Sequence, residues 1–304
     1  MELDAPLALL TSIRTGGKAT VLVTVDDVTA AVAVLKVQQA AGLPVYFLGA
    51  GTDLLVADEG YAGVVLRLGG GFHEVEGLSA RGMVTAGGAV LVTELAGQAA
   101  EAGLAGLEFA CGIPGSVGGG VATNAGAYGR AFSDVLTEVQ LATADWVRWV
   151  PARTLDWEYR HCRLPTGAMV TRARFQLRPD EPAAVLERHQ AILDMRRAVQ
   201  PQGVMTFGST FKNPSGGAAG RLLDAAGLKG ERRGGAEVSR VHANFVVNLG
   251  DASTADVLTL MSHMRSRVHE TSGVALEPEV RLLGVSFPWE SSASGTRRLP
   301  PADG

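Results

Sequence analysis

Three short motifs in the second half of the chain carry side chains that could do acid or electrostatic chemistry. Arg160 lies in a β-rich stretch, Ser209 lies in the Gly-Ser-Thr-Phe-Lys-Asn-Pro run at 208–214, and Glu279 would share one face of a strand with Arg281. A guanidinium can bind developing negative charge without titrating, and a hydroxyl with no base beside it is suited to giving a proton. Each motif also has an ordinary interpretation, as a surface arginine, a plain turn and a surface ion pair.

Other common kinds of catalytic site find little support. No histidine spacing supplies Ser209 with a base, so a Ser/His/Asp hydrolase is poorly supported. The two cysteines, Cys111 and Cys162, lack metal-ligand spacing, and so do the histidines. We therefore expect no metal and no disulfide.

Two glycine-rich segments, 49–53 and 112–120, are candidates for holding a phosphate-bearing ligand. Glycine removes the Cβ where another molecule must lie against the main chain, and bare N–H groups suit phosphates. For the second segment, a purely structural tight turn is an equally good interpretation. The candidate cofactor-binding residues are Gly49, Ala50, Gly51, Thr52, Asp53, Gly112, Gly115, Ser116, Gly118, Gly119 and Asn124.

Neither segment matches a standard nucleotide motif. A Rossmann fingerprint needs a third glycine where Leu54 stands, and a helix where residues 54–56 look extended. A P-loop at 12–18 would open on Ser12 and be followed by Ala19 instead of Ser or Thr. Two separate loops instead suggest one extended ligand clasped from several sides, and a dinucleotide such as FAD has that length.

The hydrophobic pattern places these motifs on an α+β chain of several domains. A β-α-β opening is expected at 19–25, 28–41 and 45–48. A strand-rich region with one helix follows, with strands within 64–86 and 135–177 and the helix at 93–102. The last part is a compact α+β unit, with elements at 183–199, 218–226, 245–248, 254–270 and 280–285. We therefore predict a first lobe over 1–60, a second over 61–179, a compact α+β domain over 180–288, and a disordered tail over 289–304.

Composition is that of an ordinary globular protein. The chain has 304 residues, of which 46% are hydrophobic and 19% charged, and its formal net charge is −4. That charge argues against a nucleic-acid surface. The start lacks a signal-peptide pattern, and no apolar run approaches the roughly 18 residues that span a bilayer. We expect a cytoplasmic protein without membrane insertion, as a monomer or weak oligomer.

Taken in order, the motifs resemble those of the UDP-N-acetylenolpyruvoylglucosamine reductases, flavoenzymes that make UDP-N-acetylmuramate for peptidoglycan. The resemblance covers about residues 11–285 and rests on 15–17, 49–56, 106–119, 124–129, 159–160, 208–214, 226–230, 242–245 and 279–281. It implies an FAD-binding module of two lobes, of the vanillyl-alcohol-oxidase type, followed by an α+β substrate domain. The short interval from Arg160 to Ser209 resembles the family's smaller type, which lacks an inserted lid carrying a substrate-binding tyrosine.

The resemblance also implies a reaction. NADPH would reduce non-covalently bound FAD and leave, and UDP-N-acetylglucosamine enolpyruvate would enter the same site. Hydride would pass from flavin N5 to C3 of the enolpyruvyl group, while Arg160 and Glu279 stabilise the enolate and Ser209 delivers a proton to C2. The resemblance makes Lys212, Asn213 and Arg281 candidate substrate contacts.

Departures from the family pattern and two rival functions stay open. Thr52 and Asp53 stand where the family commonly has Ser-Asn, and Asp53 adds a negative charge close to the expected pyrophosphate. Cys162 stands where a serine is usual after Tyr-Arg. The rivals are a flavin oxidase with the same FAD fold and a non-catalytic protein that binds flavin or a nucleotide sugar.

Overall fold

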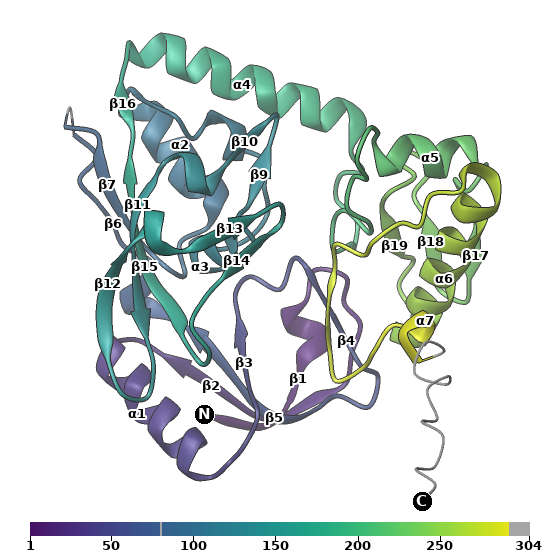
Figure 1. Cartoon of the computed structure of the whole chain (residues 1–304), viewed down its shortest axis with the longest axis horizontal. Coiled ribbons are helices and arrows are strands. Elements are labelled where there is room, and N and C mark those ends of the chain that lie inside the picture. The colour runs from purple at the N-terminus through teal and green to yellow at the C-terminus, as the bar shows by residue number, and fades with distance from the viewer. Residues whose placement is uncertain (80, 292–304) are drawn as a thin grey trace, which may run out of the picture.

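The computed structural model describes residues 1–79 and 81–291, arranged as two lobes and a C-terminal domain (Figure 1). Part of the expected disordered tail is wrong, because Pro288–Ser291 forms the last described helix, α7. Phe287 and Trp289 stack with ring centroids 4.8 Å apart, which anchors this helix. The rest of the expected tail, 292–304, lies outside the described residues.

The first lobe is a four-stranded sheet covered by one helix. Its strand order is β1-β2-β5-β3, with β1 antiparallel to β2 and the other pairs parallel. The elements are β1 (Glu2–Pro6), β2 (Lys18–Val25), α1 (Val28–Ala40), β3 (Val45–Leu48) and β5 (Tyr61–Leu68). Since β5 lies between β2 and β3, this sheet continues to Leu68, past the boundary that we expected at residue 60.

The second lobe packs two helices against a five-stranded antiparallel sheet of order β12-β11-β15-β7-β6. Its elements are β6 (Val75–Glu76), β7 (Met83–Gly87), α2 (Val92–Glu101), α3 (Val117–Ala122), β11 (Leu136–Ala142), β12 (Val147–Pro151) and β15 (Met169–Gln176). Three short pairs flank the sheet: β8 (Leu104–Ala105) with β16 (Arg178–Pro179), β9 (Gly126–Ala127) with β10 (Arg130–Ala131), and β13 (Asp156–Glu158) with β14 (His161–Arg163). Helix α3 shows that the second glycine-rich segment is only partly loop.

Glycine lets α3 approach the core closely. A Cβ on Gly120 would lie 2.6 Å from the Phe132 ring, which itself meets Phe175 edge-on at 5.4 Å. Any larger residue at 120 would have to displace a fully buried aromatic ring. The glycines of this segment therefore serve packing as well as any ligand.

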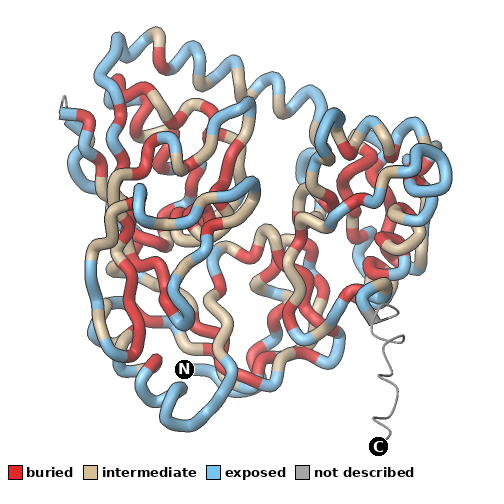
Figure 2. Tube along the Cα trace, in the orientation of Figure 1, coloured by how far each residue is buried: buried red, intermediate tan, exposed pale blue. Residues whose placement is uncertain are grey.

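A long helix leads into the C-terminal domain. Helix α4 (Pro182–Val199) runs from the second lobe to that domain, and of its side chains only Val185 is buried (Figures 1 and 2). The domain then comprises α5 (Ala219–Ala225), β17 (Arg232–Arg233), β18 (Ala236–Val238), β19 (Val246–Asn248), α6 (Thr254–Ser272) and β20 (Arg281–Leu283). Strands β17-β18-β19 form an antiparallel sheet, against which α6 packs a buried apolar face.

The C-terminal domain is joined to the first lobe by backbone pairing and by helix capping. Strand β20 runs parallel to β4 (Leu54–Val56), the extended segment after the first glycine loop. The Asp58 carboxylate accepts the main-chain N–H groups of Thr254 and Ala255 at 2.8 and 3.0 Å, at the start of α6. First-lobe residues Ile13 and Leu55 belong to the C-terminal core. These contacts fix the glycine loop relative to β20.

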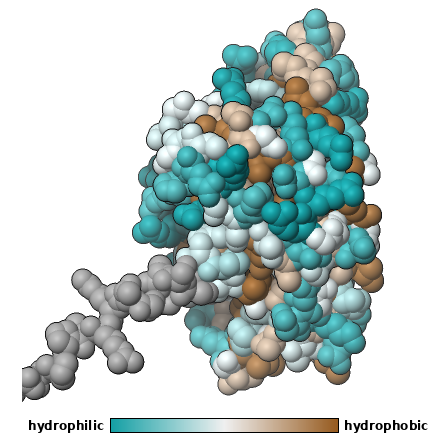
Figure 3. Space-filling view, turned by 90° about the vertical axis from the view of Figure 1, so that its right-hand side faces the viewer, coloured by the Kyte–Doolittle hydropathy of each residue, from teal (hydrophilic) through white to brown (hydrophobic). Residues whose placement is uncertain are grey.

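Seen from the side of the C-terminal domain, the surface carries hydrophobic side chains scattered among many hydrophilic ones (Figure 3). Among the described residues, no helix is long and apolar enough to cross a membrane.

Candidate active site

A cavity of about 310 Å³ lies where the two lobes and the C-terminal domain meet. It is lined by 46–54 from the first lobe, by parts of 113–127 and Arg160 from the second, and by Arg196, Gln200, 207–209, Phe245, Glu279 and Arg281. A second cavity of about 340 Å³ adjoins it and shares the lining residues Phe47, Leu48, Gly49, Ala50, Ser116, Gly119 and Ala122. The two together offer an extended site.

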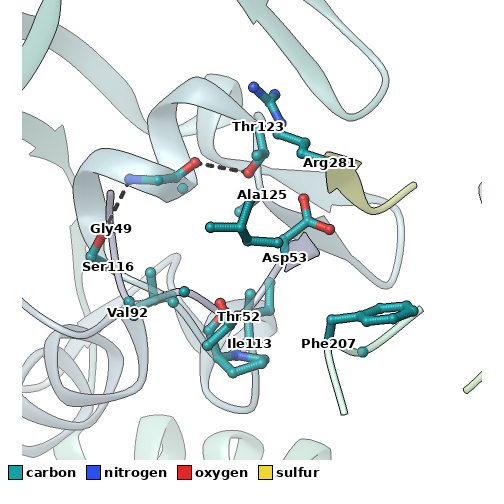
Figure 4. Close-up of a pocket in the computed structure, with 18 of the residues that line it drawn as sticks. Gly49, Thr52, Asp53, Val92, Ile113, Ser116, Thr123, Ala125, Phe207 and Arg281 are labelled. Carbon is teal, nitrogen blue, oxygen red and sulfur yellow. Dashed lines mark hydrogen bonds between the residues drawn. The ribbon is translucent and has the colours of Figure 1, made fainter. Parts of the chain in front are cut away.

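The two glycine loops meet at this cavity. Thr52 Oγ1 donates to the Pro114 carbonyl at 3.2 Å, and a Cβ on Gly49 would lie 2.6 Å from Ser116 Oγ. Ser116 Oγ in turn accepts the N–H of Gly119 at 3.3 Å (Figure 4). Both loops therefore present main chain with small side chains to the same space.

Three candidate cofactor residues have structural roles. Gly112 packs against the Arg196 side chain, and Gly118 packs against Gly88, although Gly118 also lines the second cavity. Asn124 has a left-handed φ of 44°, and its amide donates to the Glu158 carbonyl at 3.1 Å. Neither Gly112 nor Asn124 lines either of the two cavities. Contact of these two residues with the cofactor stays a prediction.

Arg160 and Glu279 form an ion pair at the cavity. Arg160 sits in the turn between β13 and β14 with a left-handed φ of 60°, and its guanidinium donates to the Gly126 carbonyl at 2.7 Å. Its Nε lies 2.7 Å from Glu279 Oε1, and the two side chains are only 23% and 17% exposed. Cys162 is buried in β14, beyond the turn. The pair joins the second lobe to the C-terminal domain.

The segments that carry Ser209 and Glu279 are hydrogen-bonded neighbours. The Thr210 carbonyl accepts the Glu279 N–H at 2.9 Å, and the Thr210 N–H donates to the Asn244 carbonyl at 2.8 Å. The Asn244 amide also bridges both main-chain groups of Phe211. Ser209 and Glu279 both line the cavity, so all three predicted catalytic side chains border one space.

Of the three candidate substrate contacts, only one lines the cavity. Arg281 lines the cavity from β20. Lys212 Nζ lies 3.7 Å from Glu277, and the Asn213 side chain accepts the Ala219 N–H at 3.0 Å at the start of α5. In the described structure Lys212 and Asn213 are not among the residues that line the cavity.

Burial changes the charge expected at the cavity. It raises the pKa of Asp53 to about 8, an effect that nearby Glu279 reinforces and Arg281 and Arg160 oppose. Burial also raises the pKa of Glu279, against the opposing effect of Arg160. A pKa of about 8 works against the negative charge that the sequence suggests for Asp53 near pH 7.

Comparison with known proteins identifies the family. Two family models match: the FAD binding domain over residues 19–145 and the UDP-N-acetylenolpyruvoylglucosamine reductase C-terminal domain over 200–283. A UDP-N-acetylenolpyruvoylglucosamine reductase of Anaeromyxobacter sp. (strain Fw109-5) is 50% identical over 281 residues, 92% of this chain and 88% of the relative. The chain belongs to the UDP-N-acetylenolpyruvoylglucosamine reductase family.

Other members of the family agree. The reductase of Parvibaculum lavamentivorans is 45% identical over 288 residues, covering 93% of this chain and 90% of that one. A crystal structure of the Thermus caldophilus reductase superposes with a TM-score of 0.79 at 37% identity, covering 91% of this chain and 97% of that chain. The α+β fold with an FAD-binding module and the assignment as an oxidoreductase are thereby confirmed. The oxidase and non-catalytic alternatives are not favoured.

The residues at the cavity fit the family's cofactor, FAD. The two glycine loops bring bare main chain together, the adjoining cavities suit a dinucleotide's length, and Arg160 and Arg281 supply positive charge. Residues 49–53 and 115–119 would hold it.

Sequence reasoning missed several lining residues, among them Tyr46, Arg196 and Gln200. Arg196 and Gln200 lie at the end of α4, where the sequence shows only a helix stopped by Gln-Pro. Tyr46 belongs to a strand that reads as buried core. No local spacing marks any of these residues, because the long-range packing of α4 and β3 brings them to the cavity.

Proposed function

We propose that the chain uses NADPH to reduce the enolpyruvyl group of UDP-N-acetylglucosamine enolpyruvate to the lactyl ether of UDP-N-acetylmuramate, in peptidoglycan synthesis. FAD, bound non-covalently by the two glycine loops, supplies the hydride. The observation that carries the proposal is that the Arg160–Glu279 pair and Ser209 line the same cavity as those loops. The names of the relatives support the same reaction.

The three side chains take different parts in the chemistry. Arg160 and Glu279 polarise the substrate carboxylate and stabilise the negative charge that builds at C2. Ser209 delivers the proton to C2, since its hydroxyl carries a proton at any physiological pH. The hydrogen bond to the Gly126 carbonyl and the ion pair with Glu279 hold the Arg160 guanidinium in place before substrate arrives.

We propose further that NADPH and the sugar nucleotide occupy this site in turn. Arg160, Ser209 and Glu279 border one cavity, which supports alternation of the two ligands. Lys212, Asn213 and Arg281 are proposed substrate contacts, of which Arg281 already faces the cavity. Both cysteines are free and buried, which supports a cytoplasmic location, and we propose a monomer or weak oligomer.

The test measures cofactor content and turnover of the purified protein. We expect FAD to be released on denaturation, and NADPH consumption to depend on added UDP-N-acetylglucosamine enolpyruvate. Flavin that is bleached by NADPH but not reoxidised by that substrate would overturn the reductase proposal. A protein that contains no FAD and cannot take it up would overturn any flavin chemistry at this site.

A further inference from the structure

The carboxyl of Asp53 faces the cavity without a partner among the described side chains. Its neighbours are engaged elsewhere: Glu279 pairs with Arg160, and the Arg281 guanidinium donates to the Ala122 carbonyl at 3.2 Å. The main-chain carbonyl of Asp53 accepts the Arg281 N–H at 3.3 Å, so the backbone is fixed while the carboxyl stays free. A ligand in the cavity is thus available as its partner.

The position of Asp53 is set by strands on both sides. It ends the first glycine loop, directly before β4, and β4 pairs with β20. In the close-up, its carboxyl lies in the middle of the pocket, between Arg281 and Thr123 on one side and Phe207 on the other (Figure 4). Asp53 therefore projects from the same loop that the proposed function assigns to FAD.

We propose that Asp53 binds FAD as a neutral carboxylic acid that donates a hydrogen bond to an acceptor atom of the cofactor, and that its ionisation at alkaline pH weakens FAD binding. This inference rests on the proposed placement of FAD at the glycine loops. An ionised carboxyl can only accept hydrogen bonds and would repel the phosphates, whereas the neutral acid has a proton to donate.

The surroundings of Asp53 favour the neutral form. The titratable and charged groups that face it are Tyr46 on β3, Arg160 in the β13–β14 turn, Glu279, and Arg281 on β20. Burial has the largest effect and Glu279 acts in the same direction, so the pKa stands at about 8 despite the two arginines. The raised value means that the acid form, and with it FAD binding, is present below this pKa and is lost as pH rises through it.

The experiment is a pH series on the purified holoenzyme. The protein is diluted to equilibrium between pH 6 and pH 9, free FAD is measured by its fluorescence, and circular dichroism checks that the fold persists. We expect the wild-type Kd to be flat below pH 7 and to rise about tenfold between pH 7 and pH 9, as linkage to a group titrating near pH 8 requires.

Three variants separate Asp53 from other groups. Asp53→Asn keeps the shape and a donor at all pH values, so its Kd should stay flat to pH 9. Glu279→Gln removes one cause of the raised pKa, so the rise should begin at lower pH. Glu277→Gln removes an exposed carboxyl that does not line the cavity and should keep the wild-type profile. Infrared difference spectra of the holoenzyme should show a protonated carboxyl that Asp53→Asn lacks.

The outcomes distinguish this inference from the proposed function. A wild-type Kd independent of pH, or a rise that persists in Asp53→Asn, overturns the role of Asp53 while leaving FAD binding intact. Failure to bind FAD at any pH overturns the proposed function as well. If Asp53→Asn does not fold, three measurements still test the role of Asp53. They are the pH dependence of the wild-type Kd, its shift in Glu279→Gln, and the infrared signal of a protonated carboxyl in the wild type.

Discussion

Glu279 Oε1 lies 2.7 Å from Arg160 Nε, and this ion pair joins the C-terminal domain to the second lobe at the cavity. The pair is largely shielded from solvent, and Arg160 is held by a second contact, to the Gly126 carbonyl. Two main-chain features prepare the pairing: the left-handed turn at Arg160 and the hydrogen bond from the Glu279 N–H to Thr210.

Arg160→Lys should slow reoxidation of the flavin by substrate about a hundredfold, the usual cost of removing one oriented donor from developing negative charge. Lysine keeps the charge but loses the planar fork. Reduction of the flavin by NADPH should be nearly unchanged. Stopped-flow measurement of the two half-reactions checks this, and equal losses in both would argue against a role in stabilising the enolate.

Ser209→Ala should leave flavin reduction by NADPH nearly intact and slow reoxidation by substrate by about two to four orders of magnitude, the range expected for loss of a general acid. Thr210→Val is the matched control. It removes the adjacent hydroxyl, which is buried, lacks a hydrogen-bond partner and does not line the cavity. If both variants slowed reoxidation equally, the proton would not come from Ser209.

Gly51→Ala should reduce both stability and FAD content. Gly51 has φ +66°, and a Cβ there would overlap the Leu10 carbonyl. Gly42→Ala is the control, because Gly42 has φ +65° but open space around it. Its free energy of unfolding should fall only by the cost of placing alanine in the left-handed conformation, about 1–2 kcal/mol. Denaturant unfolding and flavin absorbance measure the difference. Equal losses would show that the close approach to Leu10 contributes nothing.

Asp58→Ala should lower the free energy of unfolding by about 1–2 kcal/mol, because two N–H groups at the start of α6 lose their acceptor. Glu59→Gln, at the next position and also exposed, should be within about 0.5 kcal/mol of wild type. Urea unfolding gives both values. An unchanged free energy of unfolding in Asp58→Ala would mean that water replaces the carboxylate at no cost.

Much of the local structure follows from the sequence. The helices at 28–41, 93–102, 183–199 and 254–270 were predicted within a few residues of α1, α2, α4 and α6, because capping and stop signals mark their ends. Asp27 accepts the Ala30 N–H, and Ser253 forms a capping box with Asp256. Such signals act over one turn of helix and so can be read from neighbouring residues.

Relationships across the chain were harder to predict. The boundary at residue 60 was wrong because β5 joins the sheet of the strands before it, a pairing that composition does not encode. The structural role of Asn124, whose side-chain amide is hydrogen-bonded to the main chain at Glu158 and Ser133, was not predicted. Arg196 was missed because only the path of α4 brings it to the cavity. The Arg160, Ser209 and Glu279 motifs were chosen for the chemistry of their side chains, whereas their roles came from the resemblance and remain predictions.

The parallel pair of β4 and β20 also constrains when the site can assemble. Leu54–Val56 leaves the ribosome more than 200 residues before its partner, Arg281–Leu283. Chains fold from the N-terminus during synthesis, and pairing between distant segments is slow. Until β20 arrives, the first glycine loop lacks its neighbour, and Arg281 and Glu279 are absent from the cavity. A ribosome-bound chain truncated before residue 279 would therefore carry both glycine loops but no complete site, so the cavity forms only after residues 279–283 have been synthesised.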